Sequence, residues 1–392
     1  MTDLKKNIPK LRFPEFEGEW EEKKLGEIVS FGKGKLLGKK DLVEDGKYPC
    51  ILYGELYTKY GAIINNIESR TNVDPSKLKK ADKNQILIPS SGETVEDIAT
   101  ASAINVTEDV YIGGDLNILT PQKDDGRFIS LSLNSVNKWN VSRFAQGKTV
   151  VHLYNSDLKN LKINLPCQFE EQQKIGDFFS KLDRQIELEE QKLAFLKEQK
   201  KGYIQKIFSQ ELRFKDDNGN DYPEWEEKRF LDLFKVIPSK DKQINSRDVL
   251  ENGRFPVVDQ GKKLFLGYSN EKSKVIENFE DLIIYGDHTT IIKRINEPFI
   301  IGGDGVKLLT GIDEKPINYL YVLLQYSNVV PEGYKRHYSI LKTRNMYVST
   351  FAEEQCKIGN FFRGLDMLIE KQSRKVELLK QRKKGLLQKM FV

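Results

Sequence analysis

The chain has 392 residues, which is more than one hydrophobic core usually organises, so two domains of ordinary size are expected. Hydrophobic residues make up 39% and charged residues 31%, a composition that excludes a disordered chain. The net charge of +5 excludes a polybasic binder, so a DNA ligand would have to be met by a local basic face.

The spacing of the cysteines and the pattern of apolar residues exclude further classes of protein. The three cysteines, Cys50, Cys167 and Cys356, lie more than a hundred residues apart with no CxxC pair, which excludes zinc and disulfide frameworks. No run of eighteen apolar residues occurs, and residues 1–10 lack an apolar signal segment. We therefore expect a cytoplasmic location and no membrane partner.

A repeat organises the chain. Residues 170–208 match residues 353–391 with 21 identities in 39 positions, at an offset of 183. Upstream, Leu11-Arg12-Phe13 and Trp20 are echoed by Leu212-Arg213-Phe214 and Trp225, with the tryptophans 205 apart. The repeat predicts an N-terminal segment (residues 1–25), a first module (26–166), a first long helix (167–211), a second module (212–348) and a second long helix (349–392).

The two copies differ in length. Because the offset falls from 205 to 183, the first unit is 22 residues longer than the second. The similarity between Ile112-Gly113-Gly114-Asp115 and Ile301-Gly302-Gly303-Asp304 places most of the extra residues before residue 112. We expect the polar stretch 65–84 to hold them, as an added surface loop or lobe.

Both modules contain short apolar runs, such as residues 86–88 and 282–284, which are separated by Gly, Asp and Asn. This pattern predicts irregular β structure with some helix. The loops between the runs carry glycines that permit close backbone approach, Lys and Arg that suit phosphate or guanine, and Gln, Glu, Ser and Thr that can read base edges. Taken alone, each loop has the composition of an ordinary solvated turn. Taken together, some of these loops are expected to contact DNA. The candidate DNA-contacting residues are Lys33, Lys35, Tyr53, Glu55, Tyr57, Ser90, Ser91, Glu93, Thr94, Lys148 and Thr149 in the first module, and Gln260, Lys262, Lys263, Asp287, His288, Thr289, Lys335, Arg336 and His337 in the second.

The repeated segments have the period of a coiled coil. Apolar positions alternate steps of four and three, an average of 3.5 residues, as in a left-handed coiled coil. About 33 helical residues would make a rod of about 50 Å, too long to pack on one small module. The two rods are therefore expected to pack antiparallel on each other. The predicted coiled-coil spacer positions are Ile175, Phe179, Leu182, Ile186, Leu193, Leu196 and Ile207 in the first helix, and Ile358, Phe362, Leu365, Ile369, Val376, Leu379 and Met390 in the second.

We also hypothesise a register for this pair. It places Glu189 opposite Lys383, Lys200 opposite Gln372, and Leu193 opposite Leu379. The predicted fold class is thus α+β, with two α/β modules separated by a long antiparallel two-helix coiled coil in a pseudo-twofold, circular arrangement.

Catalytic interpretations find little support. Residues 32–40 resemble a phosphate-binding loop, but the glycine spacing is one residue too long and no Ser or Thr follows Lys39. The three histidines, His152, His288 and His337, are too isolated for a triad or metal site, although Asp287 beside His288 leaves an acid–base pair open. No Asn-Pro-Pro-aromatic motif for adenine methylation occurs. A DNA-binding enzyme with an unrecognised site and a coiled-coil scaffold for proteins remain the alternatives.

The chain resembles the specificity subunit of type I restriction-modification enzymes over essentially its full length. The markers are Glu-Glu-Gln-x-Lys-Ile-Gly-x-Phe-Phe at residues 170 and 353, and Lys-Lys-Gly at 200 and 383. Asp259-Gln260-Gly261-Lys262-Lys263 and Tyr285-Gly286-Asp287-His288-Thr289-Thr290 also resemble blocks of the recognition domains of that family.

The resemblance implies a function. Each module would be a target-recognition domain that reads half of an asymmetric bipartite site in double-stranded DNA, and the rods would set the spacing. Half-sites on one face of DNA lie about 34–36 Å apart, which a rod of about 50 Å can span.

The chain itself would be non-catalytic and hold no cofactor. Two modification subunits would bring S-adenosylmethionine and adenine methylation, and restriction subunits would bring nuclease and motor activity with ATP and Mg. The target sequence, the spacer length and the presence of restriction subunits stay open.

Overall fold

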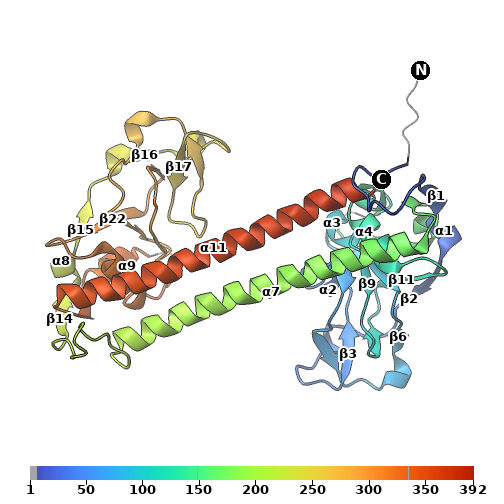
Figure 1. Cartoon of the computed structure of the whole chain (residues 1–392), viewed down its shortest axis with the longest axis horizontal. Helices are drawn as coiled ribbons and strands as arrows, with labels where there is room; N and C mark the ends of the chain where they lie inside the picture. Colours follow the sequence, from blue (N-terminus) through green and yellow to red (C-terminus); the bar gives the residue numbers. More distant parts are fainter. Residues whose placement is uncertain (1–6, 148, 334) are drawn as a thin grey trace. The chain divides into compact units, whose positions relative to one another are not determined.

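A computed structural model describes residues 7–147, 149–333 and 335–392 (Figure 1). The chain forms two compact units: unit 1 extends to Glu190 and includes Lys375–Val392, and unit 2 is Gln191–Arg374. Each unit combines one mixed α/β module with part of each long helix, as the predicted fold class requires. The units cut through both long helices, so they do not follow the borders of the five predicted segments.

The larger sheet of unit 1 has five strands and separates two cores. Its order is β2 (Val29–Lys33), β11 (Leu116–Pro121), β7 (Ile86–Pro89), β9 (Ser102–Ile104) and β4 (Ile63–Ile64). Helix α4 (Gly126–Asn134) covers β9 and β7 (Figure 1). Successive strand residues point to opposite faces, so Ile86 and Ile88 enter the core under α4 whereas Leu87 enters a second core. This double burial explains the continuous apolar run in the sequence.

The smaller sheet of unit 1 corrects one expectation. Its order is β5 (Ser69–Thr71), β3 (Tyr48–Ile51), β10 (Val110–Ile112) and β6 (Lys79–Ala81). Residues 65–84 thus supply two strands with buried side chains, such as Thr71, and do not form a surface loop. The extra length is also divided: Tyr48 pairs with Thr71, 23 residues on, whereas the equivalent Phe255 pairs with Ser269, 14 residues on.

Unit 2 repeats this plan with two four-stranded sheets. One has the order β15 (Phe234–Ile237), β22 (Val306–Gly311), β19 (Ile283–Gly286) and β20 (Ile292–Lys293), and the other has β16 (Gln243–Ile244), β21 (Ile300–Gly302), β17 (Phe255–Val258) and β18 (Gly267–Ser269). Helix α9 (Ile317–Tyr326) contacts β20 and β22. As in unit 1, Ile283 and Tyr285 point into one core and Ile284 into another.

The strand pairings identify equivalent positions in the two modules. β3 runs parallel to β10 in unit 1, as β17 does to β21 in unit 2. β11 lies between β2 and β7, as β22 lies between β15 and β19. The short ladder of β1 (Glu21–Lys24) with β13 (Lys162–Leu165) recurs as β14 (Glu226–Arg229) with β23 (Asn345–Val348). The repeated Ile-Gly-Gly-Asp residues therefore occupy the same place, at the ends of β10 and β21.

The long helices exceed the predicted length. Helix α7 (Phe169–Phe208) has 40 residues and α11 (Ala352–Met390) has 39. Every predicted spacer position is buried or half-buried: Ile175, Phe179, Leu182, Ile186, Ile207, Ile358, Phe362, Val376 and Met390 are buried, and Leu193, Leu196, Leu365, Ile369 and Leu379 are half-buried. Within each unit the helices run antiparallel, but their role as a spacer stays a prediction.

The hypothesised register is wrong. In unit 1, Lys383 contacts Asp183 at 2.5 Å and not the expected Glu189, which pairs with Lys375. In unit 2, Lys200 contacts Asp366 at 2.6 Å where Gln372 was expected. The heptad pattern could not decide this point, because a slip along the seam still places apolar residues opposite one another.

Two buried ion pairs, one in each unit, fix the repeated Leu-Arg-Phe motifs to the starts of the long helices. In unit 1, Arg12 donates two hydrogen bonds of 2.8 Å to Glu171, and in unit 2 Arg213 donates to Glu354 at 3.1–3.2 Å. Both carboxylates are fully buried. The repeated Leu-Arg-Phe motif therefore has a structural cause, namely the neutralisation of a buried carboxylate in the first turn of each long helix.

Among the described residues, no helix combines the length and the apolar character needed to cross a bilayer.

Candidate nucleic-acid interface

Two candidate loops of the first module meet beside one turn, residues 113–115, which we call the first glycine turn. The backbone N–H of Ser90 donates to Asp115 at 2.8 Å, and Ser90 accepts in turn from Leu153. Gly34, beside Lys33 and Lys35, packs so closely that a Cβ there would lie 1.9 Å from the carbonyl oxygen of Gly113. Only glycine permits that approach, so the loop after β2 is held against the turn.

A third loop of the first module, residues 53–57, starts beside the same turn. The N–H of Gly113 donates to the carbonyl of Ile51, two residues before Tyr53. In this module the exposed candidates are Lys33, Lys35, Tyr53, Glu93, Thr94 and Thr149, and the half-buried ones are Tyr57, Ser90 and Ser91. Lys148 lies outside the described residues. The oxygen of Thr94 also accepts from Asp97, so Thr94 caps α3 (Val95–Ile98).

Glu55 cannot be the base-reading residue that the sequence suggested, because its side chain is buried. It accepts hydrogen bonds from the backbone of Leu52 and from Lys59, both at 2.8 Å, and from the Ser69 hydroxyl. Burying a carboxylate is costly unless it is paired in this way. Glu55 therefore fixes the loop from inside and does not face a ligand.

The candidate loops of the second module meet beside the equivalent turn, residues 302–305, which we call the second glycine turn. Asp287 donates its N–H to Gly305 at 2.7 Å, as Ser90 donates to Asp115 in the first module. His337 donates its N–H to Asp287 at 2.7 Å, as Leu153 donates to Ser90. These two backbone hydrogen bonds therefore recur at equivalent positions in the two sets of loops.

Gln260 joins the loops of the second module. Its side-chain oxygen accepts from the N–H of His288 at 3.1 Å, and its carbonyl oxygen accepts from the hydroxyl of Thr289 at 2.5 Å. Gly305 adopts a φ of +85° beside it, and a Cβ there would lie 2.6 Å from the Gln260 amide nitrogen. Because Gln260 already accepts these hydrogen bonds within the protein, fewer of its polar groups are available to contact a base.

Two candidates in the second module are buried and hold structure. Asp287 accepts from the N–H of Tyr338 at 3.0 Å and lies 3.9 Å from the Lys307 ammonium. The His337 ring accepts from the N–H of Glu332 at 2.9 Å through Nε2, and its Nδ1 lies 3.2 Å from the carbonyl oxygen of Asp287. The contacts of Asp287 with Tyr338 and Lys307 favour a structural role over the acid–base alternative.

The remaining candidates of the second module keep polar groups near the surface. Lys262, Lys263, Lys335 and Arg336 are exposed, while Gln260, His288 and Thr289 are half-buried. The His288 ring nitrogen Nδ1 lies 3.0 Å from the carbonyl oxygen of Lys335, so the loop after β19 touches the loop before α10 (His337–Leu341). The same loops thus carry exposed cationic side chains and half-buried polar groups, which are the residue types that suit phosphates and base edges.

Lys293 on β20 contributes to this site although the sequence interpretation passed over it. Its side chain is only 6% exposed, and its ammonium contacts the loop of residues 259–263. Burial lowers the pKa of Lys293, and the neighbouring Asp259 opposes that effect. The sequence offered no signal, since one lysine inside a polar stretch is ordinarily exposed.

The glycine turns and His152 were also missed. The repeated Ile-Gly-Gly-Asp was visible as a repeat but was given no role. His152 is exposed, pairs in β12 (Val151–His152) with Ser91, and stacks on Tyr154 with ring centroids 6.2 Å apart. Two exposed rings beside the Ser91 loop add stacking groups to the first module.

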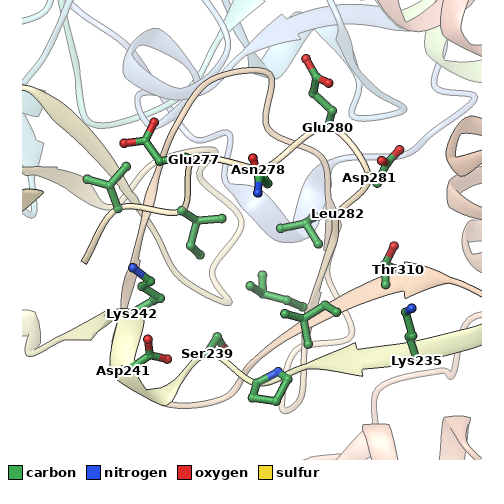
Figure 2. A pocket seen from close by; sticks show the side chains of 15 residues that line it. Lys235, Ser239, Asp241, Lys242, Glu277, Asn278, Glu280, Asp281, Leu282 and Thr310 are labelled. Carbon is green, nitrogen blue, oxygen red and sulfur yellow. The ribbon is translucent and has the colours of Figure 1, made fainter. Parts of the chain in front are cut away.

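Unit 2 also contains a pocket of about 850 Å³ (Figure 2). Figure 2 shows Glu277, Asn278 and Glu280 along one side and Ser239, Asp241 and Lys242 along the other. None of the described candidate residues lines it. Its carboxylates outnumber its lysines, so it is poorly suited to DNA phosphates. The described residues also contain no group of three or more His, Cys, Asp or Glu side chains placed to hold a metal ion.

The fold and the loops define a class of protein: two equivalent modules, each presenting cationic and polar loops around a glycine turn, with one long helix following each module in the chain. Residues 17–198 match the sequence model of the type I restriction modification DNA specificity domain. A putative type I specificity subunit of Mycoplasma pneumoniae is 24% identical, covering 98% of each chain. The type I restriction enzyme MjaVIII specificity subunit of Methanocaldococcus jannaschii is 22% identical, covering 97% of this chain and 93% of that protein.

The fold is also that of a solved relative. The crystal structure of the S subunit of a type I restriction-modification system from M. genitalium covers 98% of this chain and 99% of its own, with a TM-score of 0.69 and 19% identity. Residues 17–198 thus carry a type I restriction modification DNA specificity domain, and the whole chain is similar to proteins named as type I specificity subunits.

Proposed function

We propose that each module reads one half of an asymmetric bipartite site in double-stranded DNA. The observation that carries this proposal is the equivalence of the loops around the two glycine turns. Two backbone hydrogen bonds recur at equivalent positions in both sets, yet the side chains differ: Ser90 and Ser91 stand where the second module has Asp287 and His288. Loops of one geometry and different chemistry suit two different half-sites.

We further propose that the long helices set the distance between the half-sites. At about 1.5 Å per residue, helices of 40 and 39 residues extend about 60 Å, which exceeds the spacing of about 34–36 Å between successive half-sites on one face of DNA.

Assembly with catalytic partners completes the proposal. Two modification subunits would bind this chain with S-adenosylmethionine and methylate adenine, and restriction subunits would add ATP- and Mg-dependent translocation and cleavage. The chain itself would be non-catalytic, hold no cofactor and act in the cytoplasm. The similarity to type I specificity subunits supports this division of roles.

Selection of the full-length chain on randomised duplex DNA tests the recognition step. We expect enrichment of two different short motifs at a fixed spacing, and a loss of binding when the spacer changes by one base pair. Enrichment of a single continuous motif would contradict bipartite reading. Binding of proteins but of no DNA sequence would favour a scaffold, and methyl transfer or cleavage by the purified chain alone would favour an enzyme.

Lysine substitutions test the placement of the DNA surface. Lys262→Ala with Lys263→Ala removes two exposed cations beside Gln260, so the slope of log affinity against log salt should fall by about one unit per lost phosphate contact. The matched control, Lys371→Ala with Lys384→Ala, removes two exposed lysines of α11 and should leave that slope unchanged. An equal change in both variants would argue against this surface.

A further inference from the structure

Lys293 is a buried lysine whose ammonium contacts only one loop among the hydrogen bonds that the described structure shows. It lies on β20, paired with Ile284 of β19, and its side chain is 6% exposed. Moving an ammonium out of water is costly unless its N–H groups are satisfied. A lysine kept in such a position must therefore contribute something that an apolar residue of similar volume would not.

The contacts of Lys293 close the loop of residues 259–263. Its Nζ lies 3.0 Å from the carbonyl oxygen of Asp259, 3.5 Å from the Asp259 carboxylate and 2.5 Å from the carbonyl oxygen of Lys263. An ammonium has three donors, and these three acceptors belong to the first and last residues of the loop. One atom thus fixes both ends of the loop.

The loop that Lys293 closes belongs to the proposed reading surface. Its tip carries Gln260, which bonds the loop of His288 and Thr289, and its far end carries the exposed Lys262 and Lys263. The Asp259 carboxylate accepts from Gly261 at 2.9 Å as well, so the contact orders the backbone inside the loop. A shift of this loop would therefore displace the ammonium groups of Lys262 and Lys263 together with the side-chain amide of Gln260.

The first module shows that the strand itself does not require a lysine here. β9 pairs with β7 as β20 pairs with β19, and the position equivalent to Lys293 is Ser102, which bonds the carbonyl of Gly61. The equivalent loop, residues 52–57, is fixed instead by Glu55 from within. The two modules hold the same loop by different buried charges.

We propose that Lys293 is a positioning residue that sets the base preference of the second module by fixing residues 259–263. The inference rests on the proposed reading function. It places specificity partly beneath the surface, in a residue that touches no DNA. By the same logic Glu55 holds the corresponding loop of the first module.

The test is selection on randomised duplexes with the full-length chain carrying Lys293→Met, which keeps the volume and removes the donors. We expect discrimination between bases to fall about tenfold in one half-motif while the other half-motif is unchanged. Glu55→Gln should relax the other half-motif instead. Ser102→Ala, at the strand position equivalent to Lys293, is the matched control and should leave both half-motifs intact.

The unaffected half-motif is an internal control for folding. An unchanged pair of half-motifs in Lys293→Met would overturn the proposal. Uniform weakening of both half-motifs by Lys293→Met and by Lys293→Gln would overturn it as well, because the lysine would then support the fold and not the reading loop. If the parent chain enriches no sequence, the proposed reading function fails, and the role of Lys293 fails with it.

Discussion

Two tryptophans occupy equivalent places in the two units but differ in one hydrogen bond. Nε1 of Trp225 donates to Glu354 at 2.9 Å, whereas the buried Nε1 of Trp20 has no hydrogen-bond partner among the described residues. Trp225→Phe should therefore lower the free energy of unfolding by about 1 kcal/mol more than Trp20→Phe does, because only the former removes a donor from a buried carboxylate. Urea unfolding of both full-length variants measures the difference, and equal losses would contradict it.

At this scale the sequence predicted residue types better than residue roles. Gly34 and Gln260 of the candidate loops lie against the glycine turns, whereas the contact of these loops with DNA stays a prediction. Glu55, Asp287 and His337, by contrast, point inward. Polar residues between apolar runs look alike whether they face solvent or hold a loop, since only the fold determines which donors lie within reach.

The contact between α7 and α11 in unit 1 gives a prediction about register. Asp183 and Lys383 are 21% and 22% exposed, and a double-mutant cycle with Asp183→Asn and Lys383→Met should yield a coupling of about 1 kcal/mol. The corresponding cycle for Glu189 and Lys383 should yield less than about 0.3 kcal/mol, because Glu189 lies six residues, or about 9 Å, farther along α7. A larger coupling for the second pair would restore the register expected from the sequence.

The carboxyl of Asp183 should also make the stability of the protein depend on pH. Burial raises the pKa of Asp183, and the attraction of Lys383 offsets only part of that rise. A carboxyl with a higher pKa in the folded state binds more protons there, so its contribution to stability falls as pH rises above about 4, the ordinary value for Asp. Asp183→Asn should therefore flatten the decline in urea midpoint between about pH 4 and 7. The control Glu370→Gln, at an exposed carboxyl, should not, and a steeper decline in Asp183→Asn would show the opposite sign.

Among the elements, the long helices were the most predictable. Their 3.5-residue period extends over many turns and is repeated, whereas the strands are only two to six residues long, and some, such as β7 and β19, are buried on both faces, which removes the alternation that marks a strand. The stretch 65–84 is a different case. The sequence predicted a polar loop where β5 and β6 lie, because their pairing partners, β3 and β10, are distant in sequence.

For the whole molecule, the separate cores of the two units predict independent reading. Lys293→Met and Glu55→Gln act on loops in different units, so their effects on the free energy of specific DNA binding should add to within about 0.5 kcal/mol in the double variant. Lys293→Met combined with Thr289→Ala should not add, because both changes release the segment that contains Gln260. Binding titrations on the selected duplex measure both pairs. Additivity within the second module, or coupling above about 1 kcal/mol between the modules, would show that the reading loops are not organised by module.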